Sequence, residues 1–381
     1  MEENKEESKI FLETLSSQKF DELQELRCRL REAKTTYRNK QRECQLRKIR
    51  YISDVQIVEN INRDELIKLA HKLKHKGQVK CGVLQAIMNS LLESKDNIKT
   101  LLDVDGALQG LLRALSGQNE NFQLLAARCI CNLALGNEKS SFHVLKASDS
   151  YLLAHLMGKN HYVTEACAIA LGNFSCHGVK PIQRMLLQGF FQKIIHLVKA
   201  DNELLEGPSI YALTQLVYHG FDVLRPEYMQ EALKAVIATF QKKSFLVVFL
   251  VSILSANPSC HKIIYSHSLH KEALKHLLVA LKDKDEEAVY YLRIISNCMS
   301  TDMAGDLMNE GNEYILRESV RICLHSERNY IRKECMGLVG NIINHPNESV
   351  AHFGLGLLSE NLVLMQSHME HGEQGASKLT K

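Results

Sequence analysis

The sequence predicts an all-α fold in which helical repeats stack into a right-handed solenoid, with a basic helix at the N-terminus. Three observations support this prediction. The chain has 381 residues but only 20 Gly, 5 Pro and no Trp, so it is poor in the turn residues that a many-stranded β-protein uses. A short helical pattern returns at intervals close to 42 residues. Positive charge is concentrated before residue 51.

Composition sets the class of protein. With 45% apolar and 24% charged residues, the chain can bury a large core, which excludes wholesale disorder. The net charge of +3 is too balanced for a surface that binds nucleic acid everywhere. The 11 Cys are odd in number and dispersed, which indicates buried thiols in a reducing compartment. The polar start, Met1 to Ser8, is not typical of a secretory signal.

The first element is a basic arm. Between Gln24 and Arg50 the net charge is +7, which leaves −4 for the rest of the chain. Steps of four and three place five of its cations on one helical face. A short coiled coil and a solvated charged helix are alternatives, but we favour docking on an acidic partner. The basic residues are Arg27, Arg29, Arg31, Lys34, Arg38, Lys40, Arg42, Arg47, Lys48 and Arg50.

The body begins at the next helix. Asn62 as N-cap and Glu65 three residues later form a capping-box pattern, and Gly77 is the expected stop. We assign the arm to residues 1–60 and the repeats to residues 61–347. Residues 348–381 then form a terminal helix or cap followed by a disordered tail, unless the chain is a short form of a longer protein.

The repeats are marked by an amide that ends a short helical segment, as in AARCICNLA. The amides are Asn132, Asn173, Gln215, Asn297 and Asn341, at spacings of 41, 42, 82 and 44 residues. In the double gap Ser252 takes the amide position, because Asn257 precedes a proline that marks a helix end. An earlier unit carries Asn89. Such a period is the signature of armadillo or HEAT arrays.

Glycines and one apolar run mark further helices within the body. Gly106, Gly189 and Gly311 each precede an apolar segment that we expect to be a helix. The longest apolar run, Phe245 to Ala256, is shorter than the roughly 20 residues of a membrane span. It therefore predicts a buried core helix.

Several stretches resemble the importin alpha family of armadillo-repeat nuclear-import adaptors. They are KDNIKTLLDVDGALQGLLRAL with FQLLAARCICNLALG, IRKECMGLVGNI, and the arm ELRCRLREAKTTYRNKQRECQLRKIR, which is similar to that family's importin-beta-binding segment. LLAARCICNL, SYLLAHL and IALGNF resemble more closely a divergent group of relatives named as transmembrane and coiled-coil domain-containing proteins. The resemblance implies a cytoplasmic and nuclear adaptor whose arm binds importin beta and whose groove binds protein cargo or an extended peptide.

The chain departs from that family at the tryptophan positions, four residues before each amide. In the family, Trp faces and Asn amides hold a basic peptide. Here the tryptophan positions hold Arg128, Ile169, Tyr211, Arg293 and Gly337. The resemblance therefore implies a groove of these residues and the amides that repels a Lys-rich peptide and accepts an acidic or neutral one. Alternatively, the amides fix the stacking of the repeats by binding backbone.

Other functions have little support in the sequence. There is no Gly-rich phosphate loop, HExxH pair or nucleophile elbow, so we expect no enzyme, no catalytic residue, no cofactor and no metal site. The spacings of Cys260, His261, His267 and His270 match no established zinc pattern. Nucleic-acid binding rests on the charge of the arm alone. The leading hypothesis is a nuclear-import adaptor, and the alternative is an armadillo scaffold without a transport role.

Overall fold

The protein was analysed as a computed structural model, which describes residues 61–361 apart from 75–78, 201, 242–243, 284–285, 302 and 309. The chain divides into two units, Met1–Ile57 and Val58–Lys381. The predicted basic arm and the end of the predicted tail lie outside the described residues. All that follows on structure concerns the second unit.

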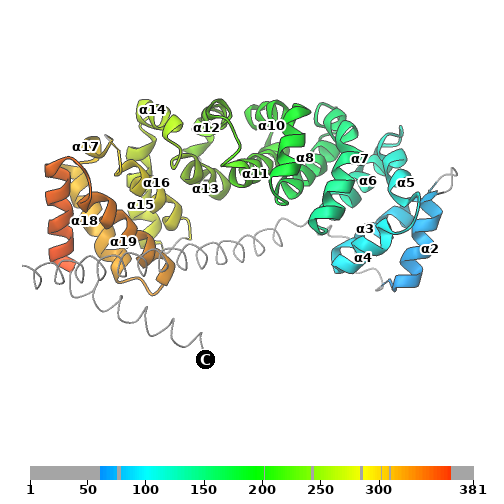
Figure 1. Ribbon diagram of the computed structural model, residues 1–381, viewed down its shortest axis with the longest axis horizontal. Coiled ribbons are helices and arrows are strands. Elements are labelled where there is room, and N and C mark those ends of the chain that lie inside the picture. Colours follow the sequence, from blue (N-terminus) through cyan, green and yellow to red (C-terminus); the bar gives the residue numbers. More distant parts are fainter. Residues whose placement is uncertain are drawn as a thin grey trace, which may run out of the picture. The chain divides into compact units, whose positions relative to one another are not determined.

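The described residues form helices that follow one another in a row, and they contain no strand (Figure 1). One helix of each repeat, called here the third helix, packs on the third helix of the next repeat. The third helices are α3 (Cys81–Glu93), α6 (Glu120–Leu133), α8 (His161–Ser175), α11 (Glu203–Gly220), α13 (Phe245–Leu254), α16 (Ala288–Cys298) and α19 (Asn329–Ile343).

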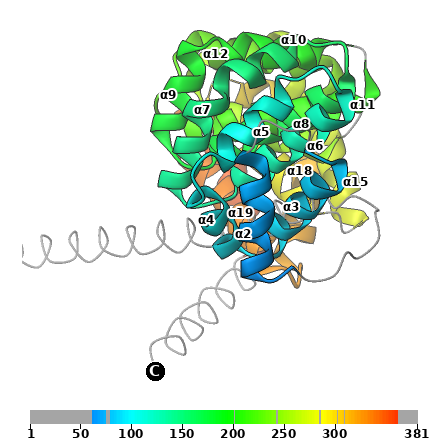
Figure 2. The ribbon, with the colours of Figure 1, turned by 90° about the vertical axis from the view of Figure 1, so that its right-hand side faces the viewer.

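The remaining helices complete the repeats, and Figure 2 shows them along the row with α2 in front. They are α2 (Arg63–Lys74), α4 (Lys95–Leu102), α5 (Ala107–Leu115), α7 (Glu138–Leu156), α9 (Val179–Leu187), α10 (Phe190–Lys199), α12 (Pro226–Phe240), α14 (Pro258–Ser266), α15 (Leu269–Lys282), α17 (Ala304–Leu307) and α18 (Glu310–Leu324). Four repeats have three helices each and end in α6, α11, α16 and α19. In the other two, one long helix stands before the third helix: α7 before α8, and α12 before α13. The predicted all-α solenoid is confirmed, and its three-helix repeats are of the armadillo type.

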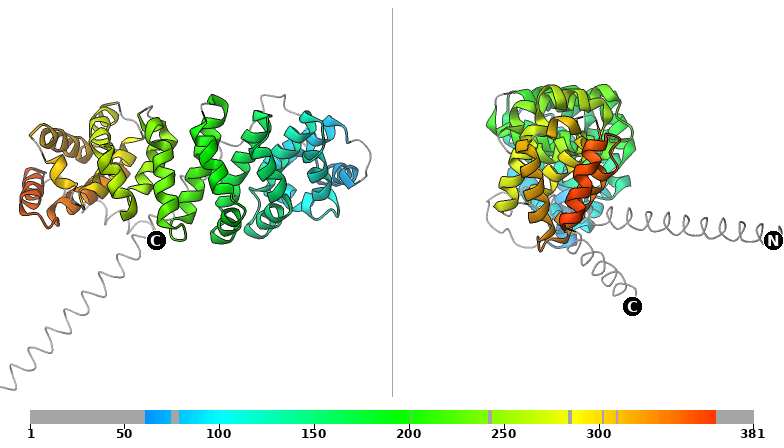
Figure 3. Two further views of the ribbon diagram at one scale, coloured as in Figure 1. Left: turned by 90° about the horizontal axis from the view of Figure 1, so that it is seen from above. Right: turned by 90° about the vertical axis from the view of Figure 1, so that its left-hand side faces the viewer.

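A last helix over residues 348–361 lies against the final repeat, at the front of the right-hand view in Figure 3. Arg317 of α18 pairs with Glu360 and lies over the ring of Phe353 at 4.7 Å. Leu357 of this last helix is fully buried. The helix therefore buries apolar surface that α18 and α19 would otherwise expose.

The helix starts follow the local sequence signals. In the capping box before α2, the Asn62 side chain accepts from the Glu65 backbone N–H at 2.9 Å, and Glu65 accepts from the Asn62 N–H at 3.2 Å. Gly106 and Gly189 have φ of 83° and 81° directly before α5 and α10, a left-handed conformation that glycine adopts without steric cost. The segment after Gly311 is helical as expected, in α18, which begins one residue before this glycine, at Glu310.

The third helices also carry a series of asparagine N-caps that the sequence analysis did not identify. Asn119, Asn160 and Asn202 cap α6, α8 and α11 with their side chains. The Asn160 amide donates to Glu120 Oε2 at 2.9 Å, and the Asn202 amide lies 2.9 Å from His161 Nδ1. Each cap thus stabilises its own helix, and Asn160 and Asn202 also contact the start of the preceding third helix.

The predicted apolar helix is α13, and it is buried on one face only. Val247, Val248, Leu250 and Val251 are fully buried, whereas Phe245 and Phe249 are half-buried. No helix among the described residues is long and apolar enough to cross a membrane.

Thiol reactivity should follow burial in this fold. Cys81 is exposed, whereas Cys131 and Cys298 are buried, and burial raises the pKa of both buried thiols to about 12. Because the thiolate is the reactive species, we expect iodoacetamide near neutral pH to modify Cys81 at least about a hundredfold faster than Cys131 or Cys298. Peptide mass spectrometry over a time course measures the rates. Equal rates at Cys81 and Cys131 in the folded protein would contradict this packing.

Candidate peptide-binding surface

The amides that mark the repeats bind the preceding third helix. Three of them donate to the backbone carbonyl that lies one residue before the preceding amide position. The contacts are Asn132 Nδ2 to Met88 O at 3.1 Å, Asn173 Nδ2 to Cys131 O at 3.2 Å and Asn341 Nδ2 to Ser296 O at 2.9 Å. The partners are 42 to 45 residues apart. One repeated residue thus makes one repeated contact between neighbouring repeats.

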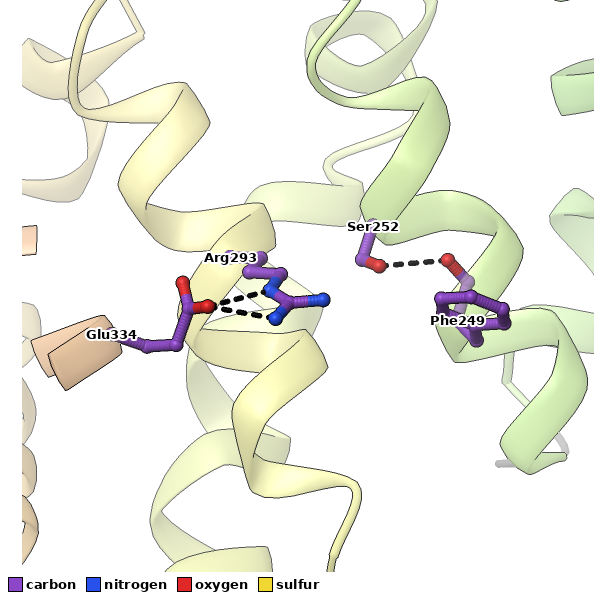
Figure 4. A network of polar contacts seen from close by, with 4 residues as sticks. All are labelled: Phe249, Ser252, Arg293 and Glu334. Atoms are coloured by element: carbon purple, nitrogen blue, oxygen red, sulfur yellow. Dashed lines mark hydrogen bonds and ion pairs between the residues drawn. The ribbon is translucent and has the colours of Figure 1, made fainter. Parts of the chain in front are cut away.

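Gln215 and Asn297 make the second kind of bridge, to a side chain three residues after the preceding amide position. Cys176 Sγ donates to Gln215 Oε1 at 3.4 Å, and Asn297 Nδ2 donates to Ser255 Oγ at 2.8 Å. The second contact has the register expected if Ser252 occupies the amide position of the α13 repeat. The Ser252 hydroxyl itself donates to Phe249 O at 2.7 Å within its own helix (Figure 4).

Asn173 uses both ends of its amide inside the body. Its oxygen accepts from the Tyr211 hydroxyl at 2.8 Å, while its nitrogen reaches Cys131. Asn132 is 2% exposed, and Asn173 and Gln215 are 6% exposed, whereas Asn297 and Asn341 are half-buried. The structure therefore gives the amides a role in stacking, and ligand binding by them stays a prediction.

Histidines four residues after two of the amides add a parallel set of bridges. His177 Nε2 lies 2.8 Å from Ala134 O, and His345 Nε2 lies 3.1 Å from Thr301 O. Because a carbonyl oxygen only accepts, Nε2 donates in both contacts. His177 thus joins the turn after α8 to the end of α6.

The tryptophan positions fall into three kinds of environment. Ile169 and Tyr211 are buried, with 5% and 1% exposure. Gly337 is exposed, and a Cβ built there would meet nothing within 4 Å. Arg128 and Arg293 are half-buried. The structure thus does not bring the five residues together as one exposed row, because the Tyr211 ring lies in the core.

Each of the two arginines has a carboxylate on the following third helix. Arg293 Nη2 and Nε lie 2.7 and 3.0 Å from Glu334 Oε1 (Figure 4), and the two side chains are 23% and 16% exposed. Burial raises the pKa of Glu165, and the positive charge of Arg128 opposes that shift. Each arginine thus has an opposite charge nearby, and the repulsion of a Lys-rich peptide by Arg128 and Arg293 stays a prediction.

Four half-buried aromatic rings lie close together on α11, α13 and α16. Ring centroids are 5.9 Å apart for Tyr218 and Phe249, 4.9 Å for Phe249 and Tyr290, and 5.4 Å for Phe245 and Tyr290. We call Tyr218, Phe245, Phe249 and Tyr290 the aromatic patch. Arg293 borders it, with its guanidinium carbon 5.7 Å from the centroid of the Tyr290 ring.

The aromatic patch was not predicted from the sequence, because the groove was assigned from the tryptophan positions and the amides alone. Phe245 and Tyr290 both lie seven residues before an amide position, as does Glu334. Two helical turns separate such residues from the amide, so all three share one place on the third helix. That repeated offset was a signal available in the sequence.

Among the described residues, no group of three or more His, Cys, Asp or Glu side chains is arranged to hold a metal ion. Two histidines of the Cys260 cluster bind backbone carbonyls. His261 Nε2 lies 3.1 Å from Ser255 O, and His267 Nδ1 lies 3.0 Å from Ile263 O. The ten predicted arm residues lie outside the described residues.

Known proteins resemble this body in sequence and in fold. No family model matches the chain. Importin subunit alpha-9 of Arabidopsis thaliana is 26% identical over 258 residues, covering 62% of this chain and 48% of that protein. The chain thus spans about half the length of the curated relative it matches.

Solved structures similar to the chain include engineered solenoids. An engineered protein aligns with a TM-score of 0.61 at 17% identity, covering 73% of this chain and 68% of its own. A designed armadillo repeat protein in complex with the peptide (KR)4 aligns with a TM-score of 0.41 at 17% identity, covering 77% of this chain and 98% of its own. The three-helix repeats and the bridges between them make the body an armadillo-type solenoid.

Proposed function

We propose that this protein is an adaptor in protein import into the nucleus, in which the third helices bind an extended segment of a cargo protein and the basic arm binds importin beta. The observation that carries the proposal is the row of third helices, which presents equivalent positions once per repeat. An extended peptide laid across such a row meets a new helix every few residues. The similarity to Importin subunit alpha-9 supports the transport role.

The charge distribution supports the role of the arm. Residues 24–50 carry +7 and the remainder carries −4, so the arm attracts an acidic partner more strongly than the chain as a whole does. Salt screens such attraction beyond about 8 Å at physiological ionic strength. Binding through the arm should therefore weaken as salt is raised. In this proposal the protein moves between cytoplasm and nucleus and acts by binding, without catalysis.

The proposal is tested by capture of purified importin beta on the immobilised full-length chain. The parent chain should bind it, and Ran with bound GTP should release it. Changing Arg27, Arg31, Arg38 and Arg42 to Glu should abolish binding, because a continuous cationic helical face becomes anionic. The matched control carries the same four-fold charge reversal at exposed lysines of the body: Lys139, Lys180, Lys199 and Lys234.

The control separates the arm from net charge. If both variants lose binding equally, the effect is one of overall charge, and the arm has no specific role. If the arm variant binds as well as the parent, the import role fails and an armadillo scaffold without a transport role is left.

A further inference from the structure

The aromatic residues that α13 contributes to the patch are not needed to fill the core between the repeats. Val247, Val248, Leu250 and Val251 already bury one face of α13 completely. Phe245 and Phe249, one turn apart, lie on the remaining face and are half-buried. Partly exposed aromatic side chains that form a contiguous surface over several elements are typical of interaction sites.

The patch is continuous over three successive repeats. Tyr218 of α11 contacts Phe249 of α13, which contacts Tyr290 of α16, with centroid separations of 5.9 and 4.9 Å. Phe245, the first residue of α13, also contacts Tyr290, and their ring centroids are 5.4 Å apart. A segment that covers these rings must therefore extend across the third helices, in the direction in which the repeats follow one another.

The side chain of Arg293 lies beside one ring at the edge of the aromatic patch. The guanidinium carbon of Arg293 lies 5.7 Å from the Tyr290 centroid, within the distance at which a cation is attracted to a ring face. A ligand Lys or Arg directed to the same ring would therefore meet a like charge at close range. The patch differs in this respect from a row of bare aromatic faces.

Arg293 also retains a donor for a ligand. Its Nε and Nη2 both address one oxygen of Glu334, and Figure 4 shows its third nitrogen pointing away from Glu334, toward the side where α13 carries Phe249 and Ser252. A charged donor beside half-buried rings is complementary to a carboxylate that follows or precedes an apolar side chain.

We propose that the aromatic patch binds an extended peptide segment that places an aromatic or aliphatic side chain on the rings and an adjacent Asp or Glu at Arg293, and that it disfavours Lys and Arg there. This inference rests on the proposed peptide-binding role of the third helices and specifies its ligand. It does not depend on the arm or on importin beta.

The test begins with a phage-displayed library of random 12-residue peptides, selected on the full-length chain and read by sequencing. We expect enrichment of an aromatic or aliphatic residue next to Asp or Glu, and depletion of Lys and Arg around it. An enriched peptide is then synthesised with its acid, with Gln in place of the acid and with Lys in place of the acid. Fluorescence anisotropy gives the three dissociation constants.

Variants connect the selected peptide to the patch. Phe249→Ala and Tyr290→Ala should each weaken binding about tenfold, which is typical of loss of a buried aromatic contact. Arg293→Gln should bring the acid and Gln peptides to within about threefold of each other, because the charge that distinguishes them is gone. Tyr314→Ala is the matched control, since Tyr314 is an aromatic residue of α18 that is 68% exposed and outside the patch. Circular dichroism checks that each variant remains folded.

The outcomes separate this inference from the proposed function. If the selection returns Lys-rich or Arg-rich peptides whose binding is lost in the Phe249 variant, the ligand class is wrong and peptide binding by the third helices stands. If no selected peptide depends on the patch, the ligand class and the peptide-binding surface both fail. An acid preference that survives Arg293→Gln overturns the role of Arg293.

Discussion

Replacing Asn173 by Leu is expected to lower the free energy of unfolding by about 2 to 3 kcal/mol. Leu branches at Cγ as Asn does but carries two methyl groups in place of the amide oxygen and nitrogen, so both hydrogen bonds of the amide are lost. The Tyr211 hydroxyl, in a side chain that is 1% exposed, loses its acceptor at 2.8 Å. The bridge from Asn173 Nδ2 to Cys131 O is lost as well. Urea unfolding followed by circular dichroism measures the change.

The double variant isolates the cause. Asn173→Leu combined with Tyr211→Phe removes the hydroxyl together with its acceptor, and replacing both partners by apolar groups is nearly neutral. We therefore expect the double variant to regain part of the stability lost in the single variant. Asn344→Leu is the control, because Asn344 is exposed and bonds only within its own turn, to Gly340 O at 2.8 Å. A double variant less stable than Asn173→Leu would show that the hydroxyl contributes elsewhere.

Gly110→Ala should destabilise the first repeats by about 2 to 4 kcal/mol, because it overpacks a helix contact. Gly110 lies in α5 and is buried. A Cβ at this position would sit 2.3 Å from Leu73 O and 2.7 Å from Leu73 Cβ. The Leu73 oxygen belongs to the backbone of α2, so α2 and α5 must separate. The same carbonyl accepts from Arg113 Nη2 at 2.6 Å, and that bond should weaken too.

Gly82→Ala is the matched control for Gly110→Ala. Gly82 lies in α3, and a Cβ there meets nothing within 4 Å. Ala is the better helix former by up to about 1 kcal/mol, so this variant should be neutral or more stable. Hydrogen exchange of the α2 and α5 amides localises the effect. Equal stability of the two variants would mean that α2 does not pack on α5 at this distance.

Most of the fold could be predicted from the regular spacing of the amides in the sequence. This spacing predicted the third helices around Asn132, Asn173 and Asn341, and even the degenerate repeat at Ser252. The same spacing allowed two predicted roles for the amides, and one of them was the stacking contact that they make in the structure. The spacing could not tell the two roles apart, since both place the amide at the same point of the repeat and differ only in what the side chain touches.

The candidate surface was less predictable. The carboxylates near Arg128 and Arg293 were not predicted, because Glu165 and Glu334 belong to the next repeat and only tertiary packing brings them to the arginines. Tyr211 was expected to line the groove, whereas its ring is buried and its hydroxyl bonds to Asn173. The partly exposed rings on α13 were hidden in the longest apolar run, where Phe245 and Phe249 look like their buried neighbours.

The short side chain at Ser252 has a mechanical consequence. Its hydroxyl is satisfied by Phe249 O within α13, so the amide bridge made at other junctions is replaced there by packing, including the ring contact between Tyr218 and Phe249. In a solenoid whose stability is a sum over neighbouring pairs, the loss of one hydrogen bond between third helices leaves more of this junction's stability to apolar and ring contacts. A ligand lying on those rings would cover the same contacts, so its binding would add to the stability of this pair of repeats.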